Sequence, residues 1–314
     1  MNKNVFLADS PTLTSNTYSG EFAGRYIASA LFSSPTIDKE LITVLPNVRY
    51  KEVIQKFDFS NLIGDASCDF GNATPASMSI DERVLTTEEF QVNLQLCKKQ
   101  LRQTWEATMM QPSVLNDTLP TSFSDFVIGY VAQQVAQQNE INIWRGTNAS
   151  VGQFNGIVTQ LCTASGSANG PLIVSQSTIT SASVINELQK IVDAIPSAVY
   201  GKEDLYIYAP ANVVKAYAFA LGTANYQFGA YVGGKPLDFL GLPIQYCPGL
   251  ASNNIVAAQK SNLFFGTALK GDFNEVRVLD MSDLDGSQNV RFVMRYAAGV
   301  QYGIGSDIVL YKNC

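Results

Sequence analysis

The residues of this chain that could do chemistry are few, and histidine is absent from its 314 residues. Histidine is the commonest general base and a frequent metal ligand, so its absence excludes Ser-His-Asp and Cys-His catalysis. Carboxylates, lysines and tyrosines could still serve an enzyme. A hydrolase of α+β architecture that works without histidine therefore stays open as a minor alternative, but we predict that the chain is not an enzyme.

A phosphate-binding loop is suggested by Gly229–Lys235, which fits the spacing G-x-x-x-x-G-K. Such a loop places Ser or Thr next, to hold magnesium, whereas this chain has Pro236, which also lacks a backbone N–H donor. No clear strand leads into the segment. We interpret it as a surface loop and predict no nucleotide and no other cofactor.

An acidic run, Asp280 followed by Asp283–Gly286, has the composition of a calcium loop. An EF-hand aligned on the glycine would need an acid at Met281 and a glutamate at Phe292, and both are missing. Asp-Gly is typical of a turn between two strands. We predict a tight turn and no metal site, with weak cation binding at the turn left as an alternative.

The cysteines are scattered, odd in number and without C-x-x-C spacing, which argues against both a disulfide framework and a zinc site. They are Cys68, Cys97, Cys162, Cys247 and Cys314. We predict free thiols in a reducing cytoplasm.

Charge is scarce: charged residues make up 15% of the chain, against roughly 25% in ordinary soluble proteins. Interface centres are depleted in charge, so this composition suits a protein packed against its own copies, with a neutral, polar secreted protein as the alternative. The net charge of −6 argues against direct binding of nucleic acid. The apolar run Val5–Ala8 is too short for a signal peptide, and no run approaches the ~18 apolar residues of a membrane span.

Residues 1–47 are predicted to form an irregular N-terminal segment. It contains a candidate helix around Phe22–Leu31. Arg49–Phe59 can form a strand, and Phe90–Leu96 alternates strictly between apolar and polar residues, as a half-buried strand does. The intervening residues are rich in Gly, Ser, Asp and Asn. We predict that the two strands are the arms of a long hairpin.

Helices follow. Ser122 can cap a long helix that runs to Trp144, followed by a helix at Val184–Ile195, a buried strand at Leu205–Tyr208 and a helix from Ala211 to Gly222. On the long helix, the predicted apolar face consists of Phe123, Phe126, Val127, Tyr130, Val131, Val135 and Ile141, and the opposite face of Gln133, Gln137 and Asn139. Four Val/Phe/Tyr-rich strand segments then complete the chain, at 253–266, 272–278, 290–300 and 307–311.

The order of these segments resembles the major capsid proteins of tailed bacteriophages. The resemblance lies in the motifs at Ser261–Gly266, Glu275–Asp280, Gly299-Val300 and Ile308–Tyr311, preceded by Gly156-Ile157, Ala209-Pro210 and Gly241–Ile244. Each motif is short, and their shared order and spacing carry the resemblance.

The resemblance implies an α+β phage major capsid fold with five parts. These are an N-terminal arm (1–47), an extended hairpin (48–98), a peripheral domain with a spine helix (99–145), an axial α/β domain (146–269) and return strands of the peripheral domain (270–314). We expect no further catalytic domain after the last strand.

The implied function is structural: self-assembly of hexamers and pentamers into the icosahedral head of a tailed double-stranded-DNA phage. The shell would form in the host cytoplasm, enclose DNA without reading its sequence, bind no membrane and meet portal, scaffold or decoration proteins. An encapsulin-type bacterial compartment is the alternative on the same fold. Predicted subunit contacts are Arg49, Lys51 and Arg83 on the hairpin and Asp283, Asp285 and Gly286 at the turn. Cross-linking of the kind known in some capsids is left unassigned.

Overall fold

The computed structural model describes residues 16–19, 33–60, 77–97, 123–167, 169–223, 237–268, 275–281, 285–287 and 289–314. The chain divides into two compact units: residues 1–33, 89–137 and 269–297 form the first, and residues 34–88, 138–268 and 298–314 form the second. The predicted helix at 22–31 and the loop at 229–235 lie outside the described residues.

The first unit is built on strand β13 (Asn289–Tyr302), which continues into the second unit. β12 (Glu275–Asp280) pairs antiparallel with β13, β1 (Asn16–Ser19) pairs with the other edge of β12, and β5 (Glu88–Cys97) also pairs with β13. On β5 the apolar residues are half-buried and the polar ones exposed, as the alternation predicted. The ring of Phe90 lies 5.6 Å from that of Tyr296 on β13.

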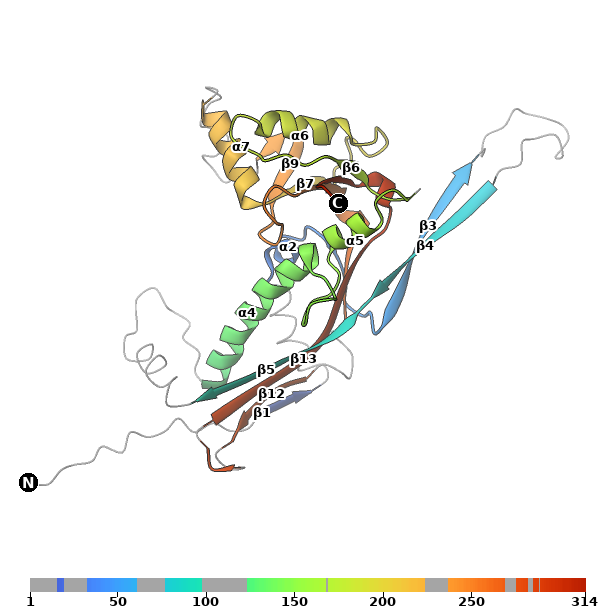
Figure 1. Ribbon diagram of the computed structural model, residues 1–314. Helices are drawn as coiled ribbons and strands as arrows, with labels where there is room; N and C mark the ends of the chain where they lie inside the picture. The colour runs from blue at the N-terminus through green and yellow to red at the C-terminus, as the bar shows by residue number, and fades with distance from the viewer. Residues whose placement is uncertain are drawn as a thin grey trace, which may run out of the picture. The chain divides into compact units, whose positions relative to one another are not determined.

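The hairpin differs from the prediction in its second arm. β3 (Lys51–Ser60) pairs antiparallel with β4 (Ser77–Thr86), from Lys51↔Thr86 to Ser60↔Ser77, and these two strands form a separate ribbon (Figure 1). The segment Phe90–Leu96 is therefore not the return arm, because β5 belongs to the sheet of the first unit. Period-2 alternation shows that a strand has one buried face, but it does not identify the pairing strand.

The second unit contains a six-stranded mixed sheet in the order β6-β14-β10-β7-β9-β8. Its strands are β6 (Leu172–Val174), β14 (Val309–Tyr311), β10 (Ile255–Gln259), β7 (Leu205–Ala209), β9 (Leu242–Tyr246) and β8 (Asp238–Phe239). β10 is antiparallel to both of its neighbours, whereas β6 is parallel to β14 and β7 is parallel to β9.

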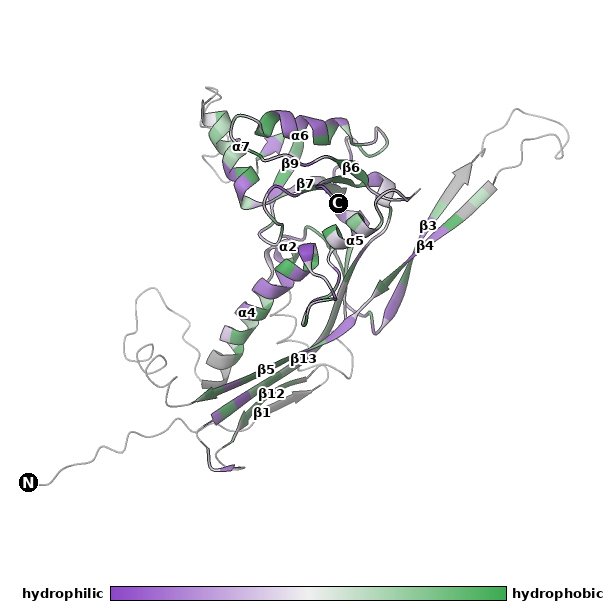
Figure 2. Cartoon of the chain, viewed as in Figure 1, coloured by the Kyte–Doolittle hydropathy of each residue, from purple (hydrophilic) through white to green (hydrophobic). Residues whose placement is uncertain are grey.

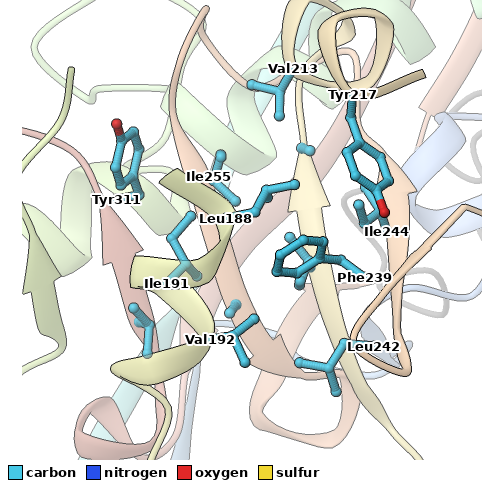
Figure 3. Close-up of a cluster of buried hydrophobic side chains, with 14 of the residues drawn as sticks. Leu188, Ile191, Val192, Val213, Tyr217, Phe239, Leu242, Ile244, Ile255 and Tyr311 are labelled. Atoms are coloured by element: carbon cyan, nitrogen blue, oxygen red, sulfur yellow. The ribbon is translucent and has the colours of Figure 1, made fainter. Parts of the chain in front are cut away.

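Two helices pack on this sheet, α6 (Val184–Asp193) and α7 (Ala211–Thr223). The core between helices and sheet is apolar and almost fully buried: Leu188 and Ile191 of α6 and Val213 of α7 meet Ile255 and Tyr311 of the strands (Figure 3). Both helices and the buried strand at Leu205–Tyr208 confirm the sequence prediction.

The rest of the second unit connects this sheet to the hairpin. β2 (Thr43–Leu45) runs parallel to β11 (Leu263–Thr267), and β11 is antiparallel to residues 298–302 of β13. Short helical elements complete the unit: α2 (Pro35–Asp38), α5 (Ile157–Thr163), η3 (Lys260–Asn262) and η4 (Gly305–Asp307).

A buried carboxylate joins α2 to the long helix α4 (Phe123–Arg145). Glu140 accepts hydrogen bonds from the backbone N–H of Thr36 (2.9 Å) and from its hydroxyl (2.6 Å), and the indole N–H of Trp144 donates to the same hydroxyl oxygen (2.9 Å). Glu140 is 2% exposed, and burial raises the pKa of its carboxyl above the ordinary value despite these hydrogen bonds. No sequence pattern indicated this network.

Among the residues of α4 whose burial the structure describes, Tyr130 and Asn139 contradict the predicted faces. Tyr130 was expected in the core but is 58% exposed, whereas Asn139 was expected at the surface and is 1% exposed. Both polar side-chain atoms of Asn139 lack a hydrogen-bond partner among the described residues. The prediction followed apolar residues alone, and the last turns of α4 bury polar residues, Glu140 and Asn142 among them.

The prediction of free thiols is wrong for two cysteines. Cys162 in α5 and Cys314 form a disulfide, with their Cα atoms 5.3 Å apart at a sequence separation of 152. Cys97 is a half-buried thiol, Cys247 is buried with a raised pKa because of desolvation, and Cys68 lies outside the described residues. The pair could not be read from spacing, because folding alone brings α5 and the segment after β14 together.

Candidate subunit interface on the hairpin

The candidate site is a surface. Among the residues that the structure describes, no group of three or more acidic or thiol side chains could hold a metal ion. None of the helices in the described ranges is long and apolar enough to cross a membrane. The candidate surface lies on the β3–β4 hairpin, where several large apolar side chains are exposed.

One face of the hairpin presents apolar side chains to solvent. In the antiparallel register Val53 lies opposite Val84 and Phe57 opposite Ile80, and directly opposed residues share a face. These four side chains are 49%, 43%, 53% and 47% exposed, and Met78 farther along β4 is 57% exposed. We call this set, Val53, Phe57, Met78, Ile80 and Val84, the apolar stripe; Figure 2 shows apolar and polar residues mixed along these strands.

The opposite face holds the hairpin to its own unit. Leu85 is fully buried, and its side chain lies against Gly266 of β11 so closely that a Cβ there would clash with it. The side-chain amide of Gln301 donates to the carbonyl oxygen of Val84 (3.0 Å). Gly299 of β13 lies against the carbonyl oxygen of Thr86, and the Cβ of any other residue at this position would clash with that oxygen. The base of the hairpin is thus fixed, and the apolar stripe faces away from the packed side.

Arg83 belongs to this inner face. Its guanidinium carbon lies 4.1 Å from the ring centroid of Tyr302, and one guanidinium N–H donates to the carbonyl oxygen of Asn169 (3.0 Å). The side-chain amide of Asn169 in turn donates to the carboxylate of Asp81 (2.8 Å). Arg83 was predicted to contact another subunit, but its guanidinium has partners within its own chain.

The other two basic residues predicted at an interface are exposed. Arg49 precedes β3, and Lys51 is its first residue, with the ammonium 5.2 Å from the ring centroid of Tyr50. Tyr50 itself is 66% exposed. Both cations therefore lie at the base of the hairpin and are accessible to another molecule.

The acidic segment lies between β12, which ends at Asp280, and β13, which begins at Asn289, so the connection is longer than the tight turn that was predicted. Asp285 and Gly286 are exposed, Gly286 has a φ of +70°, and Asp283 lies outside the described residues. Ser287 lowers the pKa of Asp285 through its side chain and through its backbone N–H, which donates a hydrogen bond to the carboxylate (2.9 Å). Asp285 therefore has a hydrogen-bond partner within its own loop, and the residue is exposed to solvent.

Comparison with known proteins gives a clear result for the fold and none for the sequence: no family model and no curated protein matches the chain. Among solved structures, a chain of the satellite phage P4 procapsid including size determination (Sid) protein aligns over 98% of this chain and 94% of its own. Its TM-score is 0.60 at 11% identity. The capsid of a native GTA particle aligns over 98% and 96%, with a TM-score of 0.56 at 15% identity.

A third match is the capsid of Myoviridae phage XM1, which covers 99% of this chain and 97% of its own, with a TM-score of 0.55 at 11% identity. These alignments run over nearly the whole length of both partners. The chain therefore has the α+β fold of phage major capsid proteins, and the resemblance seen in its sequence is confirmed at the level of the fold.

Proposed function

We propose that this chain is the major capsid protein of a tailed double-stranded-DNA phage, and that its function is to assemble with its own copies into a closed icosahedral shell. The fold supports this function, because the matched structures are capsids. The observation that carries the proposal is the apolar stripe. A protein that worked alone would gain nothing from a ribbon whose outer face exposes five large apolar side chains.

The stripe would be covered by a second copy of the chain. Each stripe residue is about half exposed, so covering it adds roughly 1 kcal/mol, about half of the value for full burial of such a side chain. Single contacts of this size are weak. In a closed symmetric lattice each subunit makes several contacts at once, and many weak contacts then give a stable shell.

Charged residues flank the apolar contact in this proposal. Arg49 and Lys51 at the hairpin base and the acidic turn with Asp283, Asp285 and Gly286 would meet neighbouring subunits, where charge sets orientation and register more than affinity. An interface role for Arg83 would act through the base of the hairpin, because its guanidinium is already bound within the chain.

We further propose where the shell assembles and which other proteins it binds. The shell would form in the cytoplasm of a bacterial host and enclose DNA without specific contacts, which agrees with the net charge of −6. Portal, scaffold or decoration proteins would join it. The P4 procapsid chain comes from an assembly that includes a size determination protein, which supports this class of partner. The five-part domain division stays a prediction.

The test is assembly of the purified full-length chain, followed by sedimentation velocity and negative-stain electron microscopy over a range of concentrations. We expect closed, hollow particles above a threshold concentration. A chain that stays monomeric at every concentration and salt level would contradict the proposal. Particles that enclose a co-purifying enzyme would favour the encapsulin alternative instead.

A further inference from the structure

The disulfide lies beside the shortest internal strand of the second-unit sheet. β14 has three residues and lies between β6 and β10, so its loss would leave two new strand edges. Its residues Val309, Leu310 and Tyr311 are fully buried. Cys314 follows β14 after two residues, and its partner Cys162 lies in α5, whose Ile157, Val158 and Leu161 are buried.

Both cysteines are positioned by contacts that do not involve sulfur. After β14, the backbone N–H of Lys312 donates to the carbonyl oxygen of Val174 (3.2 Å), and the side chain of Asn313 binds the backbone N–H (2.9 Å) and carbonyl oxygen (3.2 Å) of Gln176. On the α5 side, Gln160 donates to the carbonyl oxygen of Val300 (2.8 Å). The two thiols would thus meet in the folded chain before any bond forms.

Both residues of the disulfide also reach the surface of the protein. Cys314 is exposed and Cys162 is half-buried. Thiol–disulfide exchange needs this access, because a thiolate must reach the sulfur that it attacks. An accessible disulfide responds to the redox state of its surroundings, unlike one sealed in a core.

We infer that the Cys162–Cys314 disulfide is a redox-dependent lock on β14 that forms after the chain has folded and assembled. The inference rests on the proposed function for its timing: inside a host cell the thiols stay reduced, and they are oxidised once the particle is released. The oxidant is a low-molecular-weight disulfide. Its S–S bond is reduced to two thiols while the two cysteines lose their protons and two electrons to form the protein S–S bond.

The disulfide restrains local opening of the second-unit sheet at β14. With the bond formed, the segment after β14 is tied to α5, whose apolar residues Ile157, Val158 and Leu161 are buried, so the bond restrains β14 from leaving the space between β6 and β10. With the bond reduced, the same strand is held only by its own pairing and side-chain contacts, such as the hydrogen bond from the Tyr311 hydroxyl to Glu187 (2.8 Å). Local opening of such a strand is measured by amide hydrogen exchange.

The experiment compares the full-length protein treated with a reducing thiol and with oxidised glutathione. Peptide mass spectrometry under non-reducing conditions should find the Cys162–Cys314 peptide only after oxidation. Hydrogen exchange at Val309–Tyr311 should be about tenfold faster in the reduced protein. Cys314→Ser should show the fast rate under both conditions, and Cys97→Ser, which changes a half-buried thiol elsewhere, should behave as the unchanged chain.

Particles should form under both conditions, since the lock follows assembly. Equal exchange rates in the oxidised and reduced protein, absence of the linked peptide, or assembly that requires oxidation would each overturn the inference. If no particles form under either condition, the proposed function fails. The peptide and exchange data on the unassembled chain would still decide whether the disulfide locks β14.

Discussion

Replacing the apolar stripe by small polar residues should weaken assembly without unfolding the subunit. In the triple variant Val53→Ser, Phe57→Ser, Ile80→Ser, the changed side chains are 49%, 53% and 47% exposed in the single chain. Full burial of such side chains contributes roughly 1.5–3 kcal/mol each, so covering the exposed half contributes about 1 kcal/mol each. The variant should therefore lose about 3 kcal/mol per hairpin contact, close to a hundredfold in the dissociation constant.

The assay is the threshold concentration for particle formation, measured by light scattering and confirmed by negative-stain microscopy. We expect the threshold to rise by at least about a hundredfold, or particles to be absent at accessible concentrations. The matched control is Gln55→Ser, which lies on the same face of β3 and removes only an exposed hydrogen bond to Glu82 (3.0 Å). This control should assemble at the threshold of the unchanged chain.

Circular dichroism and thermal unfolding of the unassembled triple variant should match those of the unchanged chain, because the stripe lies opposite the face that holds the hairpin. An unchanged assembly threshold in a correctly folded triple variant would refute the reasoning, since the stripe would then face solvent in the particle as well.

Three further predictions concern other parts of the chain. The raised pKa of Glu140 means that its contribution to stability is present below the ordinary pKa and is lost as pH rises through the folded value. The unassembled chain should therefore melt at a lower temperature as pH rises above the ordinary carboxyl pKa, and Glu140→Gln should flatten this dependence; an unchanged or steeper dependence in the variant would contradict the assignment. Leu85→Ala should cost about 2–5 kcal/mol in chemical denaturation because it empties a fully buried position at the hairpin base, and a loss below about 0.5 kcal/mol would show that this base is not packed. Changing Asp283 and Asp285 to Lys should abolish particles by placing like charges against a neighbour at about 1 kcal/mol or more per junction, with circular dichroism unchanged; normal particles would show that the turn faces solvent.

The sequence indicated the fold through local patterns. The period-2 alternation of Phe90–Leu96, the helix that stops before Pro196 and the order of the last four strands each depend on residues close in sequence. The structure confirms the strand at Phe90–Leu96, the helix and the three final strands, whereas the segment 253–266 forms two strands, β10 and β11, which belong to different sheets. The absence of histidine is equally a property of the sequence, and it excludes histidine-dependent catalysis whatever the fold.

Only part of the candidate site could be predicted from the sequence. A hairpin at this place was expected, but its return arm was assigned to β5, because β4 has charged residues on its inner face and lacks the clean alternation of β5. The apolar stripe depends on the pairing of Val53 with Val84 and of Phe57 with Ile80, residues about 30 and 20 positions apart. A register of this kind is set by turn geometry and by packing on β11, neither of which a short window of sequence contains.

By itself, then, the sequence determined the longer helices and several of the strands, that little charge is available, and that the segments occur in the order typical of a capsid fold, because these follow from side-chain type and local spacing. Tertiary structure alone decided that Cys162 meets Cys314, that Glu140 is buried beneath α2, and that one hairpin face is left uncovered. Each of these depends on contacts between residues far apart in the chain. Such contacts are fixed by packing of the whole subunit, which minimises exposed apolar area over all elements at once.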